Sequence, residues 1–118
     1  MAIIIKTENP EGLLVSIKKN IDTKSIETWS YDSDGDFTHN PEQWKLKAWF
    51  KPHISAGELK FGILGRNDVQ LSTYLYGIYH GRFIEMILNH FDSKFKEVYA
   101  TSMPIKGLDV IPKVVQVS

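Results

Sequence analysis

The stretch from Ser72 to Lys96 reads STYLYGIYHGRFIEMILNHFDSKFK, and it decides how this chain is built. Ser72 or Thr73 can accept hydrogen bonds from the first free amides of a helix, and no proline interrupts the residues that follow. We therefore predict one long helix that runs from this cap to about Lys96. At about 100° per residue its apolar side chains cover an arc of roughly 220°, about twice the stripe that a surface helix buries.

One face of a sheet cannot bury an apolar arc of that width. The first helix, the C-terminal segment or a second chain must bury the remainder. Gly77 and Gly81 lie on the border of the arc, and each costs a helix interior about 0.8–1 kcal/mol relative to alanine. Three interpretations stay open: another backbone packs closely there, the helix breaks near residue 80, or the glycines face a ligand. The first predicts an interface formed by Gly77, Gly81, Ile84 and Leu88.

The residues before the long helix have the period of strands. Ile26–Tyr31 is rich in β-branched and aromatic residues and leads into the Asp-Gly turn composition of Asp32–Asp36, which predicts a hairpin. The alternation of Trp44–Lys51 predicts the clearest strand, ended by Pro52, and Glu58–Leu64 alternates in a similar way.

The two ends of the chain complete the predicted fold. Asn9-Pro10-Glu11 has the form of a helix start and predicts a short helix over about 10–22, although the composition of this stretch leaves a strand open. Val98–Met103 and Val110–Val117 predict further strands, the last of them an edge strand. We expect a single α+β domain over 1–118. It contains an antiparallel sheet of about four to six strands, with one long helix and one short helix packed on one face.

Composition excludes several classes of protein. The 118 residues suit one domain, and the absence of cysteine excludes a disulfide framework, a cysteine-ligated zinc and thiol catalysis. Fourteen basic and fourteen acidic residues give a formal net charge of zero, which argues against bulk attraction to nucleic acid or an anionic membrane. No apolar run is long enough for a secretory signal or a membrane span, so we expect a cytoplasmic protein.

Candidate metal and catalytic groups are sparse. His80 and His90 are separated by about 15 Å along a helix axis, too far to share one metal ion. The acids of Asp32–Asp36 alternate as in a calcium loop, but the glycine and glutamate spacing of an EF-hand fails. A charged turn accounts for them, with a weak cation site left open. No complete catalytic motif occurs, and we expect no catalytic residue, no metal and no cofactor.

Two classes of function fit these observations. The first is a non-enzymatic protein-interaction module, a homodimer or the partner of another protein, because apolar surface left over after folding marks an interface. The alternative is a small-ligand-binding domain or modest enzyme with an aromatic pocket between the sheet and the long helix. Trp29, Tyr76 and His80 are its candidate lining residues, and His53 and Arg66 are its candidate polar anchors.

A nucleic-acid binder is the third and weakest hypothesis. Lys45, Lys47 and Lys51 share a face of the predicted strand with Trp49, an arrangement that can hold phosphates and stack a base. The neighbouring acidic hairpin would repel a phosphate backbone, and lysines also guard strands that face solvent. The sequence therefore does not favour a nucleic-acid partner.

Three segments resemble small uncharacterised bacterial α+β proteins, including those carried on the mobile gene cassettes of integrons. They are Tyr31–His39, Gln43–Pro52 and Tyr79–Phe83. The resemblance implies a bacterial source and a compact sheet-plus-helix domain. Such proteins share no common activity, so it assigns no role to any residue.

Overall fold

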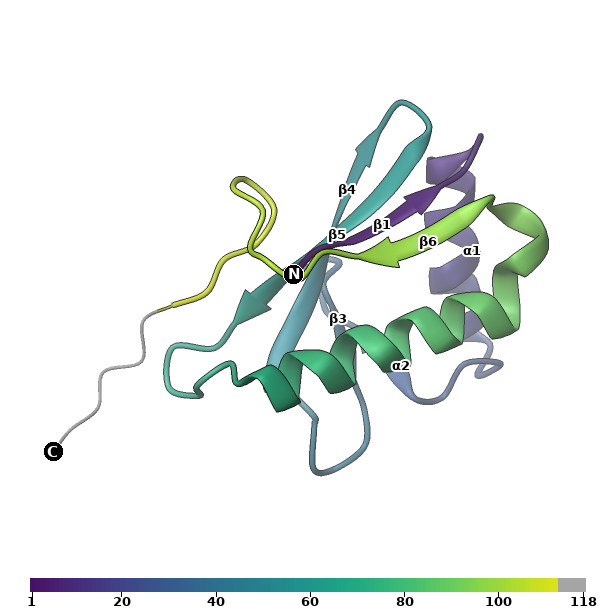
Figure 1. The fold of residues 1–118 in the computed structure, drawn as a ribbon. Coiled ribbons are helices and arrows are strands. Elements are labelled where there is room, and N and C mark those ends of the chain that lie inside the picture. Colours follow the sequence, from purple (N-terminus) through teal and green to yellow (C-terminus); the bar gives the residue numbers. More distant parts are fainter. Residues whose placement is uncertain (113–118) are drawn as a thin grey trace, which may run out of the picture.

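The computed structural model describes residues 1–112, in which two helices pack on one face of a six-stranded antiparallel sheet (Figure 1). In chain order the elements are β1 (Ile3–Lys6), α1 (Pro10–Asp22), β2 (Trp29–Tyr31), β3 (Phe37–His39), β4 (Ala48–Ser55), β5 (Glu58–Gly65), α2 (Thr73–Phe91), a 3-10 turn (Asp92–Lys94) and β6 (Glu97–Ala100). The strands lie in the order β2-β3-β4-β5-β1-β6. This is the α+β architecture that the sequence predicts.

The core is a layer of aromatic rings between the sheet and α2. Phe83 of α2 lies 4.7 Å from Phe61 and 5.0 Å from Phe50, measured between ring centroids. Trp29 meets the same Phe83 ring edge-on at 5.0 Å. Each of these side chains is at most 1% exposed. Large rings in offset and edge-on contact bury much apolar area, so this layer fixes α2 against the sheet.

Helix α1 forms over the residues that its start signal predicts. The Asn9 side chain accepts a hydrogen bond from the amide of Gly12 at 3.0 Å, and Pro10 occupies the first turn, where no backbone donor is needed. Leu13 and Ile17, one turn apart, are buried against the sheet. The strand that the composition left open for this stretch is therefore excluded.

Strand β1 is the element that the sequence analysis missed. It lies between β5 and β6, with Ile3 opposite Phe61 of β5 and Ala100 of β6. Ile3 and Ile5 are fully buried, and Ile4 on the opposite face is 7% exposed. A strand buried on both faces has a continuous apolar sequence instead of an alternating one, and four such residues carry no periodic signal.

The strand predicted at Trp44–Lys51 is displaced toward the C-terminus, because β4 begins at Ala48 and continues through Pro52. Residues before Ala48 form turns. The proline is tolerated because residues alternate in direction along the β4–β5 ladder, so the backbone nitrogen of Pro52 points away from β5. It points toward the β3 side, where β3 pairs with β4 only at Phe50 and no amide of residue 52 is needed. The prediction that Pro52 ends the strand was wrong for this reason.

Helix α2 is continuous from Thr73 to Phe91, so of the interpretations left open the break near residue 80 does not occur. The Ser72 side chain caps it by accepting the amide of Leu75 at 3.1 Å. The helix ends before the predicted Lys96, because the following residues are drawn into the sheet region by hydrogen bonds between β1 and the chain leading to β6. None of the helices within residues 1–112 is both long enough and apolar enough to cross a lipid bilayer.

Residues 105–112 form a strap along the end of β5. Val110 forms an isolated parallel bridge with Leu64 near the end of β5. The bridge lies on the same side of β5 as β1, which pairs with the first half of that strand. A strand was predicted over Val110–Val117; the part of it from residue 113 onward lies outside the described residues. A side-chain carbon at Gly62 would lie 1.8 Å from the carbonyl oxygen of Leu108, so only glycine permits this crossing.

Replacing Gly62 by alanine is therefore expected to lift the strap. We expect Gly62→Ala to lower the free energy of unfolding by about 1–3 kcal/mol and to expose the amide of Val110, which donates to Ile63 at 2.9 Å, to hydrogen exchange. Chemical denaturation and amide exchange measure the two effects. Lys60→Ala on the same strand is the control, and continued protection of Val110 in the alanine variant contradicts the prediction.

Candidate functional site

Three of the five residues predicted to line a pocket lie in or beside the aromatic core. Trp29 is 1% exposed and is surrounded by rings from β3, β4 and α2. His80 is 5% exposed, and its ring nitrogens contact the carbonyl oxygens of Tyr76 and Met1. Burial is the main cause that lowers the pKa of His80 below its usual value. Side chains fill the space between the sheet and α2 around these residues.

The two predicted polar anchors lie elsewhere. His53 is half-buried on the face of β4 that the helices leave open, and burial, followed by the charge of Lys51, lowers its pKa. Arg66 follows β5 and binds the carboxylate of Asp68 at 2.6 Å and 2.8 Å, while it also donates to the Leu46 carbonyl at 3.2 Å. The five side chains therefore do not converge on one site.

The predicted interface residues, in contrast, share one side of α2. Measured from Phe83 at the centre of the buried face, Ile84, Gly77, Leu88 and Gly81 fall at about 100° to 160° around the helix. We call these four residues the glycine flank. The buried face of α2 takes up most of its apolar arc, which leaves Leu88 48% exposed and Ile84 half-buried.

Nothing in the described part of the chain packs closely on the two glycines. A side-chain carbon built at Gly77 or Gly81 would have no atom within 4 Å. A hollow of about 290 Å³ lies against these glycines and is also lined by Ile78, Arg82 and Glu85. The close backbone approach that the sequence predicts is therefore not made by residues 1–112.

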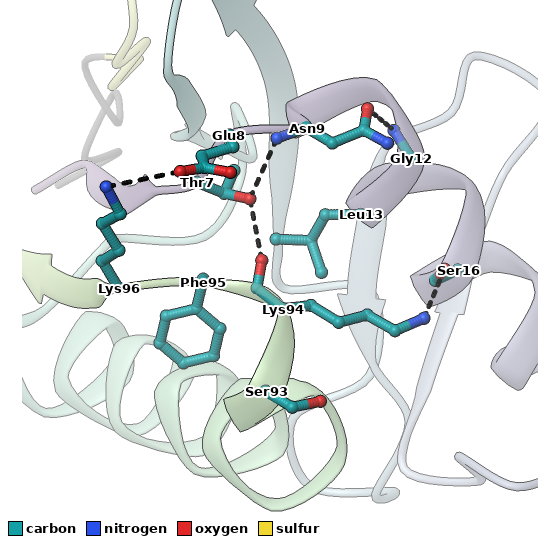
Figure 2. A pocket seen from close by; sticks show the side chains of 10 residues that line it. All are labelled: Thr7, Glu8, Asn9, Gly12, Leu13, Ser16, Ser93, Lys94, Phe95 and Lys96. Carbon is teal, nitrogen blue, oxygen red and sulfur yellow. Dashed lines mark hydrogen bonds and ion pairs between the residues drawn. The ribbon is translucent and has the colours of Figure 1, made fainter.

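A larger polar groove of about 590 Å³ lies between the N-terminus of α1 and the chain before β6 (Figure 2). Its polar groups are joined to one another. Thr7 donates to the Lys94 carbonyl at 2.8 Å, Lys94 donates to Ser16 at 3.2 Å, and Lys96 pairs with Glu8 at 3.6 Å. These bonds join the segment that follows α2 to the residues before α1 and, through Ser16, to α1 itself.

The acidic turn predicted at Asp32–Asp36 is present between β2 and β3. Asp32 accepts the amides of Asp34 and Asp36, each at 3.0 Å, so it closes the turn. Carboxylate oxygens of all three aspartates lie within 4.8 Å of one another. One oxygen of Asp36 is buried and has no partner among the described residues. Burial, followed by repulsion from Asp32, raises the pKa of Asp36.

The basic strand face that motivated the nucleic-acid hypothesis is not formed as predicted. Lys45 and Lys47 belong to the turns that precede β4, and only Trp49 and Lys51 share its outer face. The chain enters β4 through Leu46, whose φ of 59° lies in the left-handed region. The alternation that suggested four residues on one face therefore did not correspond to a single strand.

Sequence reasoning missed two polar groups that organise the structure. Tyr79 donates to the Trp44 carbonyl at 2.5 Å and lies 3.1 Å from the hydroxyl of Thr38, which joins α2 to the turn before β4. The side chain of Asp109 is fully buried and accepts the amides of Ile63 at 2.9 Å and Ile105 at 2.7 Å. The only sequence signal for Asp109 was its position as a single acidic residue in an apolar stretch.

Neutralising Asp36 is expected to stabilise the protein at neutral pH. The pKa of Asp36 is higher in the folded state than in the unfolded state. The free energy of unfolding therefore falls as the pH rises from the unfolded pKa to the folded pKa, and above the folded pKa the full destabilisation by the charged carboxylate is present. Asp36→Asn should therefore raise the urea midpoint at pH 7 and have little effect below about pH 4. The exposed Glu42→Gln is the control. An Asp36→Asn midpoint equal to that of the original protein at every pH contradicts the prediction.

No protein-family model, no curated protein and no solved structure matches this chain. The resemblance to small bacterial cassette proteins accordingly stays a prediction.

Proposed function

We propose that this chain is a non-enzymatic protein-interaction module that associates with a second copy of itself through the glycine flank. The observation that supports this proposal is the open space beside Gly77 and Gly81. Two glycines in a continuous helix cost about 0.8–1 kcal/mol each relative to alanine, and no contact within residues 1–112 uses their small size. A partner helix that approaches closely would use it.

The exposed apolar side chains of α2 favour a second copy as that partner. Tyr74 is 69% exposed and Leu88 is 48% exposed, and each lies seven residues, or about 10.5 Å, from Gly81. In an antiparallel pair of α2 helices related by a two-fold axis at Gly81, Tyr74 of each copy therefore faces Leu88 of the other. A self-complementary patch of this kind is what a two-fold interface requires.

Charged side chains border this contact. Arg82 and Glu85 form an ion pair at 3.1 Å, and both side chains line the hollow beside Gly77 and Gly81. The flank itself carries no charged side chain. An uncharged, partly apolar strip of helix is typical of the centre of an interface, and charged groups are typical of its rim.

Alanine at both glycines should affect folding and association in opposite directions. Gly77→Ala with Gly81→Ala is expected to raise the free energy of unfolding of the monomer by about 1.6–2 kcal/mol, because alanine is the better helix former. The two added methyl groups should weaken self-association by about tenfold or more, equal to at least 1.4 kcal/mol, because they separate the two helices. Chemical denaturation at low concentration and sedimentation velocity at micromolar concentrations measure the two effects.

Asn89→Ala is the matched control, since Asn89 is exposed on the opposite flank of the same helix. It should stabilise the helix by up to about 0.7 kcal/mol without changing the association constant. The proposal is rejected if the original protein sediments as a monomer throughout this range. It is also rejected if the double alanine variant associates as tightly as the original.

A further inference from the structure

We infer that the two copies also join their sheets, with β6 of each copy pairing antiparallel to β6 of the other about a two-fold axis at Tyr99. This inference rests on the proposed self-association and specifies how the second copy is placed. It would extend the six-stranded sheet of each copy into one continuous sheet across the dimer.

Strand β6 is an unprotected edge. It is the last strand of the sheet, and no strand within residues 1–112 pairs with its outer side. Its four residues, Glu97–Ala100, include no proline, and Glu97 at the start of the strand is their one charged side chain. The opposite edge, β2, is only three residues long. The β6 edge is therefore the one that can accept another strand.

The free hydrogen-bonding groups of this edge belong to Val98 and Ala100. Thr101 donates its amide to the Ala2 carbonyl at 2.9 Å, so its backbone groups face β1. Residues alternate in direction along an antiparallel ladder, and Tyr99 and Glu97 therefore also face β1. The amides and carbonyls of Val98 and Ala100 consequently point outward, toward the open side.

One register uses these groups fully. With the axis at Tyr99, Val98 of each copy lies opposite Ala100 of the other, and the two pairs form four hydrogen bonds. An axis at Val98 would require the outward groups of Lys96, but the Lys96 amide already donates to the Lys6 carbonyl at 2.7 Å. An axis at Glu97 would place two like charges opposite each other, which is unfavourable.

The glycine flank lies on the β6 side of α2, because His80 on that side contacts Met1 beside β1, whereas Met86 on the other side borders Ile26 before β2. A two-fold axis normal to the sheet keeps the helices of both copies on the same face. Figure 1 shows that β6 and α2 lie on the same side of the molecule, in the foreground of the view. Sheet pairing and helix packing can therefore form one continuous interface. On the open face, the Tyr99 side chains, each 40% exposed in a single copy, would contact each other across the axis.

Cysteine cross-linking tests this register directly, because the chain contains no cysteine of its own. Residues opposite each other at a non-hydrogen-bonded position have Cβ atoms about 4.5–5.5 Å apart, close enough for a disulfide after small adjustments. Tyr99→Cys should therefore form a covalent dimer on mild oxidation. Ala100→Cys should not, because residue 100 faces Val98 of the partner copy. Efficient cross-linking of Ala100→Cys, with none from Tyr99→Cys, overturns the register.

Proline at residue 100 tests the edge itself. Ala100→Pro removes one outward amide while leaving the inward bonds of β6 to β1 intact, and it should weaken self-association at least tenfold by sedimentation velocity. Ala100→Val keeps the amide and is the matched control, and circular dichroism confirms that both variants fold. A second outcome is that the original protein dimerises while Ala100→Pro leaves the association constant unchanged and Tyr99→Cys forms no covalent dimer. In that case sheet pairing is wrong and the proposed function stands. If the original protein is a monomer, both proposals fail.

Discussion

The packing of Phe83 against the aromatic face of the sheet is the contact on which the rest of the structure depends. It joins α2 to both β4 and β5, and Trp29 of β2 packs on the same ring. Because this contact fixes how α2 is rotated about its own axis, it also decides which residues of α2 face outward. The glycine flank is exposed as a direct result of what Phe83 buries.

Several polar side chains hold distant segments of the fold together. Tyr79, Asp109 and Thr7 each bind backbone groups of distant segments. The concave groove beside α1 is crossed by bonds between its own residues (Figure 2). What these contacts leave free is a side of the molecule with an open strand edge and an uncharged strip of helix. The proposed self-association depends on this surface.

The sequence supported the fold at most of its local signals, with the alternation of Trp44–Lys51 and the stop at Pro52 as exceptions. The cap at Asn9, the turn at Asp32–Asp36 and the cap at Ser72 each produce the element that they predict. The failures involve contacts between distant residues. The short β1 is identified only by its two neighbours in the sheet, and α2 ends where hydrogen bonds from β1 draw the chain away. The predicted pocket residues depended on the same distant packing, which placed Trp29 in the core and His53 on the other face of the sheet.

The position of Pro52 has a further consequence. Beyond Phe50, β4 extends past its partner β3, so within residues 1–112 one side of the β4–β5 hairpin has no neighbouring strand. A bare stretch of this kind can recruit chains indefinitely and seed fibrils. Pro52 presents a ring on that side where other residues would present an amide, and Lys51 adds a charge nearby. The residue that breaks the expected strand pattern therefore also hinders the addition of another strand at this side of β4.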